Sequence, residues 1–323
     1  MKPFTAILLS CLLLLSILPS CAFRKGCSSK AAERDLLTLV PGDSHALLSV
    51  DAKGLRGSPA GKRLVKALID PGDCLHPLVS GKVEDVLVVY GGGKVIGTSF
   101  ALVRCGGCTL EEMKACAARN FGLCFGEKPG PGPGGKPFFF SPCRHDLYLG
   151  EIEEGIFALG VKEGLLAAVD AGEGKAPSLA GSKILASLEG SLPAGSAVSL
   201  LVLDGQKFGE GIFGTGNPFM AELLAFRRAA LGLRVGKGSI DVGAKLLYDA
   251  GGSPTAGEAA ADIRAKLLQL AAHPIAVQLG LDAYVKRIAV EEGQGTVDLS
   301  FSAGEKELFD FIDAKRDILT IGL

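Results

Sequence analysis

Two cysteines separated by two glycines are the residues of this chain whose types and spacing best suit chemistry. Cys105 and Cys108 form a Cys-Gly-Gly-Cys motif, and a pair with this spacing can cycle between dithiol and disulfide. The same pair can instead form a permanent disulfide that only stabilises the fold. A third use is zinc binding, in which Cys124 and either Cys143 or His145 would complete four ligands.

The residues around this pair favour a structural disulfide. A thioredoxin-like thiol-disulfide oxidoreductase is expected to place its first cysteine at a helix N-terminus, where the helix dipole stabilises the thiolate. Here Thr109 and Glu112 form the T-x-x-E pattern of a capping box, so both cysteines precede the predicted helix. Pro137 is a candidate for the proline that faces the dithiol in that family. A zinc ribbon normally carries a second Cys-x-x-Cys pair, and none occurs.

The first 21 residues have the layout of an export signal. Lys2 precedes an uncharged apolar run that contains the segment AILLSCLLLLSILPSC. A short positive end, an apolar core and then small residues are typical of a signal peptide. Cleavage after Ala22 would release a soluble secreted protein, and about 20 apolar residues are also enough for an uncleaved membrane anchor.

The end of this signal, Leu18-Pro19-Ser20-Cys21, resembles the lipobox of bacterial lipoproteins. The resemblance implies that Cys21 is acylated, for example with palmitate, and becomes the new N-terminus after cleavage. It therefore implies a lipid anchor on the periplasmic or extracellular side of a membrane of the cell envelope. Ala22 stands where many inner-membrane lipoproteins carry aspartate, which favours the outer membrane.

Export decides how the nine cysteines are interpreted, because disulfides form and persist outside the cytoplasm. Cys11 would be removed with the signal, Cys21 would carry the lipid, and Cys27 lies in a polar segment after it. The remaining six are the disulfide candidates: Cys74, Cys105, Cys108, Cys116, Cys124 and Cys143. Six cysteines allow many different pairings, which the sequence does not distinguish.

Composition indicates a folded, turn-rich protein with two domains. About 290 residues follow the signal and tether, which is more than one hydrophobic core usually organises. The formal net charge is -1 with acids and bases interspersed, which argues against a nucleic-acid-binding surface. The 45 glycines show no collagen-like period.

The two halves of the folded region show a weak internal repeat. The first opens with LVPGDSHALLSVD and the second with LPAGSAVSLLVLD, each predicting a turn, a buried strand and a closing aspartate. SPAGKRLVKAL and NPFMAELLAFRRAAL follow, each with the Ser-Pro or Asn-Pro start expected of a helix. Two strands come next in the first half, VEDVLVVYGG and GTSFALVRC, and GSIDVGAKLLYDA takes their place in the second.

The repeat also covers the cysteine motif. The segment AGGS at residues 250–253 corresponds to CGGC, and after a shift of one residue the T-x-x-E pattern recurs at Thr255 and Glu258. Both copies therefore predict a strand, a double-glycine turn and a capped helix. Because the second copy lacks both sulfurs, this geometry does not exist to present a dithiol. We expect the sulfurs to be structural braces.

Each half is expected to close with further strands and a helix. The first does so through PFFFSPCRHDLYLGEIEEGIFALG and VKEGLLAAVDAG, and the second through residues 283–316. Val297, Leu299 and Phe301 alternate with polar residues, which is typical of a strand with one solvated face.

The remaining polar features have ordinary structural explanations. The acidic pairs Glu153-Glu154 and Glu291-Glu292 stand beside glycine and are expected in solvated hairpin turns rather than in a catalytic couple. The segment FGEKPGPGPGGKP predicts a flexible loop, and a disulfide near its ends would stabilise the fold by about 2 to 4 kcal/mol. Turn or surface positions are expected for three histidines: His45, His76 and His273.

We therefore predict an α+β protein with two tandem repeated domains, each an antiparallel sheet covered by helices on one face. Residues 1–21 form the signal peptide and 22–34 a flexible tether. Residues 35–175 form the cysteine-rich first domain and 176–323 the cysteine-free second domain.

The predicted function is that of a non-enzymatic, membrane-anchored envelope lipoprotein that acts as a binding or structural module. The sequence predicts no catalytic residues, no metal and no cofactor. Its expected partners are the membrane, through the lipid on Cys21, and a protein or an apolar ligand, but no nucleic acid. The alternative is a thioredoxin-like thiol-disulfide oxidoreductase that acts through Cys105 and Cys108.

Overall fold

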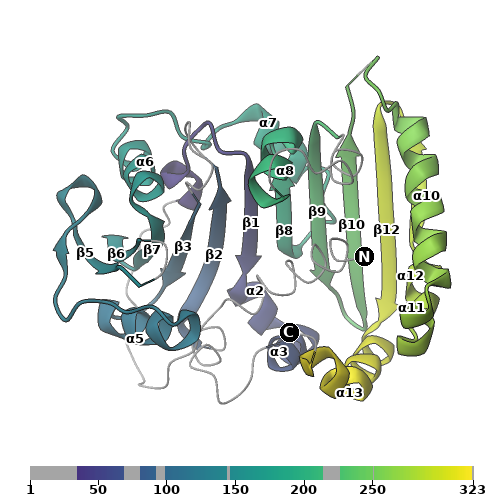
Figure 1. The fold of residues 1–323 in the computed structure, drawn as a ribbon, viewed down its shortest axis with the longest axis horizontal. Helices are drawn as coiled ribbons and strands as arrows, with labels where there is room; N and C mark the ends of the chain where they lie inside the picture. The colour runs from purple at the N-terminus through teal and green to yellow at the C-terminus, as the bar shows by residue number, and fades with distance from the viewer. Residues whose placement is uncertain are drawn as a thin grey trace. The chain divides into compact units, whose positions relative to one another are not determined.

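The computed structural model describes residues 35–68, 81–91, 99–143, 146–213, 226–249 and 251–321 (Figure 1). The chain divides into two compact units. Unit 1 comprises the described residues up to Ser44 and Ser49–Ala180, and unit 2 comprises His45–Leu48 and those from Gly181 onward. The predicted domain boundary at residues 175/176 stays a prediction.

The chain up to residue 180 contains the elements predicted for the first half. SPAGKRLVKAL and VKEGLLAAVDAG form helices, and VEDVLVVYGG and GTSFALVRC form strands, as expected. In chain order the elements are η1 (Leu36–Leu39), β1 (Ala46–Asp51), α2 (Ala52–Gly57), α3 (Pro59–Leu68), β2 (Val83–Tyr90), β3 (Phe100–Cys105), α5 (Leu110–Phe121), β4 (Gly130–Pro131), η3 (Pro133–Gly135), β5 (Pro137–Ser141), β6 (Leu147–Glu153), β7 (Ile156–Val161) and α6 (Lys162–Gly172).

The rest of the chain departs from the prediction at one helix. The helix expected over NPFMAELLAFRRAAL is wrong from Arg228 onward, because Arg228–Val235 is a strand that pairs with the next one. In chain order the elements are α7 (Lys183–Glu189), β8 (Ser196–Val202), α8 (Gly205–Phe213), β9 (Arg228–Val235), β10 (Ser239–Leu247), α10 (Ala256–Ala272), α11 (Pro274–Leu279), α12 (Asp282–Val285), β11 (Ala289–Gly293), β12 (Thr296–Gly304) and α13 (Glu305–Ile321).

The closing aspartates of the two opening strands start the helices that follow them. Asp51 ends β1, and its Oδ1 accepts a hydrogen bond from the Gly54 N–H, which caps α2. Asp204 follows β8, and its Oδ1 accepts one from the Lys207 N–H at 3.0 Å at the start of α8. A side-chain acceptor at this position satisfies an N–H that would otherwise lack a partner. The helix after β8 therefore begins directly at the strand end.

The strands form one twelve-stranded sheet, in the order β11-β12-β10-β9-β8-β1-β2-β3-β7-β6-β5-β4. Neighbouring strands such as β2 and β3, or β9 and β10, run antiparallel. The fold is α+β, as predicted, but a single sheet replaces the two sheets that the sequence predicted. Any edge strand presents the same unpaired backbone N–H and C=O groups, whatever its side chains. The periodicity of the side chains therefore does not predict which two edge strands pair with each other.

Unit 1 has an aromatic core. Phe138, Phe139 and Phe157 are each 1% exposed. Phe138 and Phe139 are successive residues of β5 and therefore point to opposite faces of the sheet. Both faces are consequently covered at this strand, in contrast to the predicted sheet with helices on one face.

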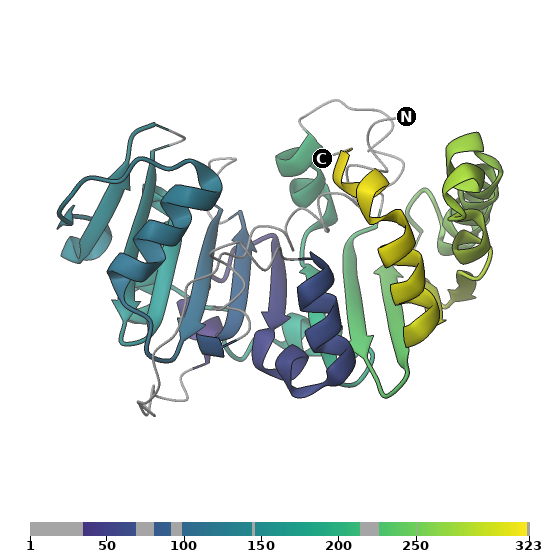
Figure 2. The same cartoon turned by 90° about the horizontal axis from the view of Figure 1, so that it is seen from below.

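Unit 2 has a core of smaller side chains. Ala260 and Val297 are completely buried, Ala256 and Ala259 nearly so, and Leu246 is among the residues that pack against them. Helices α10 and α13 both pack against β12 (Figure 2). Among the described residues, no helix combines the length and the apolar character needed to cross a membrane.

The second acidic pair does not lie where the sequence placed it. Glu291 and Glu292 are in β11, where they pair with Asp298 and Val297 of β12. The turn itself begins beyond Gly293, and the positive φ of Gly295, 71°, provides the left-handed backbone that it requires. The prediction of a hairpin turn at this place is correct, but the acids precede it as exposed strand residues.

Candidate functional site

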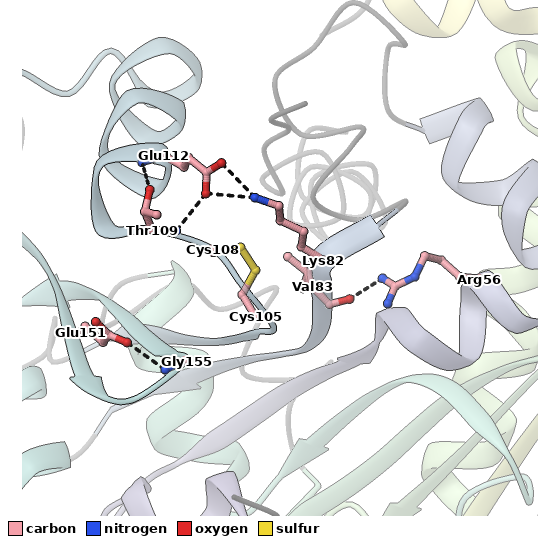
Figure 3. Close-up of a disulfide and its surroundings, with 9 residues drawn as sticks. All are labelled: Arg56, Lys82, Val83, Cys105, Cys108, Thr109, Glu112, Glu151 and Gly155. Carbon is pink, nitrogen blue, oxygen red and sulfur yellow. Dashed lines mark hydrogen bonds and ion pairs between the residues drawn. A yellow bond between two sulfur atoms is a disulfide. The ribbon is translucent and has the colours of Figure 1, made fainter. Parts of the chain in front are cut away.

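The Cys-Gly-Gly-Cys motif connects β3 to α5 and is closed by a disulfide. Cys105 is the last residue of β3, and its sulfur bonds to that of Cys108, with 5.6 Å between the Cα atoms (Figure 3). Cys105 is completely buried, whereas Cys108 is partly exposed. The Cys105 N–H donates to the Gly155 carbonyl oxygen at 2.9 Å, which ties this strand end to the β6–β7 turn.

Backbone interactions shape the turn between the two cysteines. The Gly106 N–H donates to the Lys82 carbonyl oxygen at 3.1 Å. Gly107 has a φ of 75°, in the left-handed region that glycine adopts without steric cost. No atom lies within 4 Å of the position that a Gly107 Cβ would occupy, so conformation rather than crowding requires glycine there.

The predicted capping box at the start of α5 is confirmed. The Thr109 Oγ1 accepts a hydrogen bond from the Glu112 N–H at 3.2 Å, and the Glu112 Oε2 accepts one from the Thr109 N–H at 2.8 Å. Both cysteines therefore precede the N-cap, as the sequence predicted. This position differs from the one that a thioredoxin-like dithiol requires.

The Glu112 carboxylate is also bound by a lysine. The Lys82 Nζ lies 2.9 and 3.1 Å from its two oxygens (Figure 3). Burial acts to raise the pKa of Glu112, but the hydrogen bonds from Lys82 and Thr109 outweigh it and lower the pKa below its ordinary value. Glu112 is thus held by Lys82 and by the helix cap, and its lowered pKa makes it a weak acceptor for a thiol proton.

The other charged side chains drawn around this disulfide bind backbone. Arg56 donates from Nη1 to the Val83 carbonyl oxygen, and Glu151 accepts from the Gly155 N–H at 2.8 Å through Oε1 (Figure 3). Burial lowers the pKa of Arg56, although the acids near it act in the opposite direction. These interactions hold strand ends and turns in place. They do not position a proton-accepting group beside the disulfide sulfurs.

Pro137 does not face the disulfide. It begins β5, which is separated from β3 by β7 and β6 in the sheet. Adjacent strands lie about 4.8 Å apart, so three steps place the two strands roughly 14 Å from each other. Pro137 therefore gives no support to the thioredoxin-like alternative, because the β6–β7 hairpin lies between it and the disulfide.

A second disulfide joins Cys124 to Cys143, with 5.8 Å between the Cα atoms. Both cysteines are exposed. The bond spans the proline- and glycine-rich segment, a pairing that the sequence had left open. With all four of these sulfurs in disulfides, none is a free thiolate for zinc, and the described residues hold no group of three metal-ligating side chains.

The structure places only some of the other candidates. Cys116 lies in α5 and is buried. His273 is the N-cap of α11, where its Nδ1 accepts a hydrogen bond from the Ile275 N–H at 3.2 Å, so the expected turn position is confirmed. The remaining candidates lie outside the described residues: Cys11, Cys21, Cys27, Cys74, His76 and His145.

Unit 2 repeats the capped helix without sulfur. Glu258 and Thr255 form a capping box at the start of α10, with a Glu258 N–H to Thr255 Oγ1 distance of 3.3 Å and a return bond of 2.8 Å. The connection before this cap is longer than in unit 1. Gly107 lies two residues before its cap, whereas Gly251, with nearly the same φ of 76°, lies four residues before. The expected shift of one residue is therefore wrong, although the order of elements is as predicted.

Comparison with known proteins yields only a distant structural likeness. No protein-family model matches the chain, and no curated protein is similar to it in sequence. Crystal forms I, III and IV of the protein TP0453 are similar to it with a TM-score of 0.44, at 10%, 10% and 12% identity. These matches cover 88% of this chain and 99 to 100% of the other.

Proposed function

We propose that this protein is an exported, lipid-anchored binding module whose disulfides are mechanical braces. One observation carries the proposal: the capped helix start of α5, which follows Cys105 and Cys108, recurs at α10 with no sulfur. The geometry around the motif is therefore a general feature of the fold. A reactive dithiol would need an accessible first sulfur, and Cys105 is completely buried.

The two units are, in this proposal, copies of one module. The order of elements supports it, because in both units helices follow the first strand and the third strand: α2 and α3 after β1, α8 after β8, α5 after β3, and α10 to α12 after β10. The order in the sheet supports it as well. Unit 1 runs β1-β2-β3-β7-β6, and unit 2 runs β8-β9-β10-β12-β11. The extra strands β4 and β5 of unit 1 lie in the segment that Cys124 and Cys143 enclose.

The lipid anchor is proposed at Cys21, with the folded units held by the polar tether at the outer membrane of the cell envelope. Labelling growing cells with a radioactive or alkyne-tagged fatty acid tests it. The wild-type protein should be labelled and remain with membranes. Cys21→Ala should lose the label and leave the membrane fraction, with Cys27→Ala as the matched control that keeps both. Label retained in Cys21→Ala would contradict the anchor.

The partner is proposed to be a protein or an apolar ligand that contacts α10 and α11. Leu268 is 68% exposed, Ile275 52% and Val277 54%. Large apolar side chains exposed on adjoining helices are more typical of an interaction surface than of a free one. Leu268→Lys with Ile275→Lys should abolish crosslinking to the partner in intact cells. The control Leu166→Lys, on α6 of unit 1, should leave it unchanged.

The enzymatic alternative is thiol-disulfide exchange through Cys105 and Cys108, and it makes the opposite prediction for one variant. An oxidoreductase would reduce insulin and lose this activity in Cys105→Ser while remaining folded. If the disulfide is purely structural, the wild-type protein should not reduce insulin, and Cys105→Ser should have a lower melting temperature. Mapping which cysteines become free thiols under mild reductant separates the two cases before any variant is made, because only the oxidoreductase frees Cys105 and Cys108.

A further inference from the structure

The Cys124–Cys143 disulfide has surroundings that set it apart from the Cys-Gly-Gly-Cys bond. The Cys143 Sγ accepts a hydrogen bond from the Cys124 N–H at 2.8 Å, and it lies 3.5 Å from the Ser141 Oγ. Ser141 is completely buried beneath these exposed cysteines. Its hydroxyl oxygen already accepts from the Cys124 N–H at 3.1 Å, so its own hydrogen is available to the Cys143 sulfur.

We propose that Cys124–Cys143, rather than the Cys-Gly-Gly-Cys pair, is the site at which this protein exchanges disulfides reversibly with an external thiol. The incoming thiolate forms a new S–S bond to Cys124, the Cys124–Cys143 bond breaks, and Cys143 leaves as the thiolate. Return attack by Cys143 on Cys124 releases the external thiol as its thiolate. No electrons are gained or lost overall in the exchange, and the external thiol is the only co-reactant.

Hydrogen bonds favour Cys143 as the leaving sulfur. Exchange is faster when the leaving thiolate is more stable, and donors that point at a sulfur stabilise its anion. The Cys124 N–H and the Ser141 hydroxyl occupy these positions before the bond opens. When Cys143 is protonated, the Gly122 carbonyl oxygen, 3.7 Å from Sγ, is placed to accept the thiol hydrogen.

The Cys-Gly-Gly-Cys bond lacks these features. An external thiol can reach only Cys108, because Cys105 is completely buried. Attack there would expel Cys105 as a thiolate that is completely shielded from water, and this desolvation opposes its ionisation. Only two residues separate the cysteines, so the open form closes again rapidly. The bond that sequence motifs mark as redox-active is thus the protected one.

Opening the exposed bond removes the covalent constraint on the segment between the two cysteines, whose strand β5 is also held by its pairing with β6. This segment contains β4, η3 and β5, and β4 is the terminal strand of the sheet. Through this exchange, the concentration of external thiol would control how well the edge strand β4 is ordered. The inference goes beyond the proposed function, because an envelope binding module requires neither bond to open.

Reduced glutathione is the probe for this exchange. The oxidised, folded protein is incubated with glutathione, quenched with acid and N-ethylmaleimide, and mapped by peptide mass spectrometry over time. We expect glutathione on Cys124 and N-ethylmaleimide on Cys143 at least tenfold sooner than any label on Cys105 or Cys108. First labelling of Cys105 or Cys108, or equal rates for the two bonds, would overturn the proposal.

Variants of two buried serines in unit 1 test whether the Ser141 hydroxyl speeds the opening of Cys124–Cys143 or whether solvent exposure of the bond alone explains its reactivity. Ser141→Ala removes the hydroxyl that faces Cys143, and we expect it to slow the opening of Cys124–Cys143 by three- to tenfold. Ser44→Ala makes the same chemical change at a buried serine whose hydroxyl donates to the Pro41 carbonyl oxygen, and it should leave the rate unchanged. The rate at Cys105–Cys108, recorded in the same samples, reports whether either variant loosens the fold. An unchanged rate in Ser141→Ala would show that its hydroxyl has no role.

Discussion

The starts of α5 and α10 show what sequence can add to a structural element without altering it. Each helix begins with a threonine and a glutamate that exchange hydrogen bonds with each other's backbone. Unit 1 adds a disulfide directly before the cap, and unit 2 has a longer connection with no cysteine. The cap therefore depends on the spacing of Thr and Glu, and the sulfur is a separate addition. The comparison predicts that the units respond alike to loss of a cap and differently to loss of sulfur.

The largest expected difference concerns the cores, which can be compared at β7 and β12. Phe157→Ala removes a ring that is 1% exposed and should lower the free energy of unfolding by about 3 to 5 kcal/mol. Val297→Ala, in the corresponding place of unit 2, removes fewer atoms and should cost less. Urea denaturation of both variants measures this. Equal losses would show that the aromatic core of unit 1 contributes no more than the alanine-rich core of unit 2.

The second prediction removes the longer brace. Cys124→Ser with Cys143→Ser frees a segment of 18 residues between them and should cost about 3 kcal/mol, because the unfolded chain is no longer constrained. The loss should appear in unit 1 and not in unit 2. Urea denaturation followed by hydrogen exchange of each unit checks it. Serine is close in size to cysteine and both positions are exposed, so a loss in unit 2 would contradict the account.

The third prediction compares the caps. Thr109→Ala and Thr255→Ala each remove an acceptor for the amide three residues later, and each should cost about 1 kcal/mol in protein whose disulfides are reduced. Thr→Ser at the same positions retains the hydroxyl and serves as the matched control. If Thr109→Ala alone has no effect, the cap does not stabilise the start of α5, and the comparison between the two helices fails.

The smallest effect is the pH dependence of the two caps. Hydrogen bonds from Thr255 lower the pKa of Glu258, and those from Lys82 and Thr109 lower the pKa of Glu112 against the effect of burial. A carboxyl group with a lowered folded-state pKa contributes stability above its unfolded pKa of about 4.3. This stability is lost as the pH falls through the lower folded value. Chemical denaturation between about pH 5 and pH 3 should therefore show a shallower pH dependence in Glu112→Gln and in Glu258→Gln than in the wild type.

Local structure is largely predictable because it depends on neighbours in sequence. The T-x-x-E spacing predicts both caps, and Ser58 before Pro59 predicts the start of α3, where the Ser58 Oγ accepts from the Gly61 N–H at 2.9 Å. The aspartates at the strand ends carry a further signal. Asp51 and Asp204 mark the strand ends and also cap the helices that follow, so α8 begins directly after β8, whereas the expected Asn-Pro helix start at residues 217–218 lies outside the described residues.

Features that depend on distant contacts are less predictable. All twelve strands belong to one sheet because edge strands pair through their backbone groups, and no side-chain pattern in the sequence predicts this pairing. The pairing of six cysteines depends on which strands and loops meet in space, so the sequence provides candidates without partners. The contrast between buried Cys105 and exposed Cys124 has the same origin, because both stand in similar glycine-rich surroundings in the sequence.

Hydrogen exchange of the oxidised and the fully reduced protein, resolved by peptide, tests most directly whether the sulfurs brace one of two sibling modules. The account predicts that the slowest amides of unit 1 exchange about a hundredfold faster after reduction, which corresponds to about 3 kcal/mol. The amides of unit 2 should keep their rates, and α5 should remain as protected relative to its unit as α10 is. If reduction accelerated amide exchange equally in both units, or did not accelerate it in unit 1, the result would contradict the account.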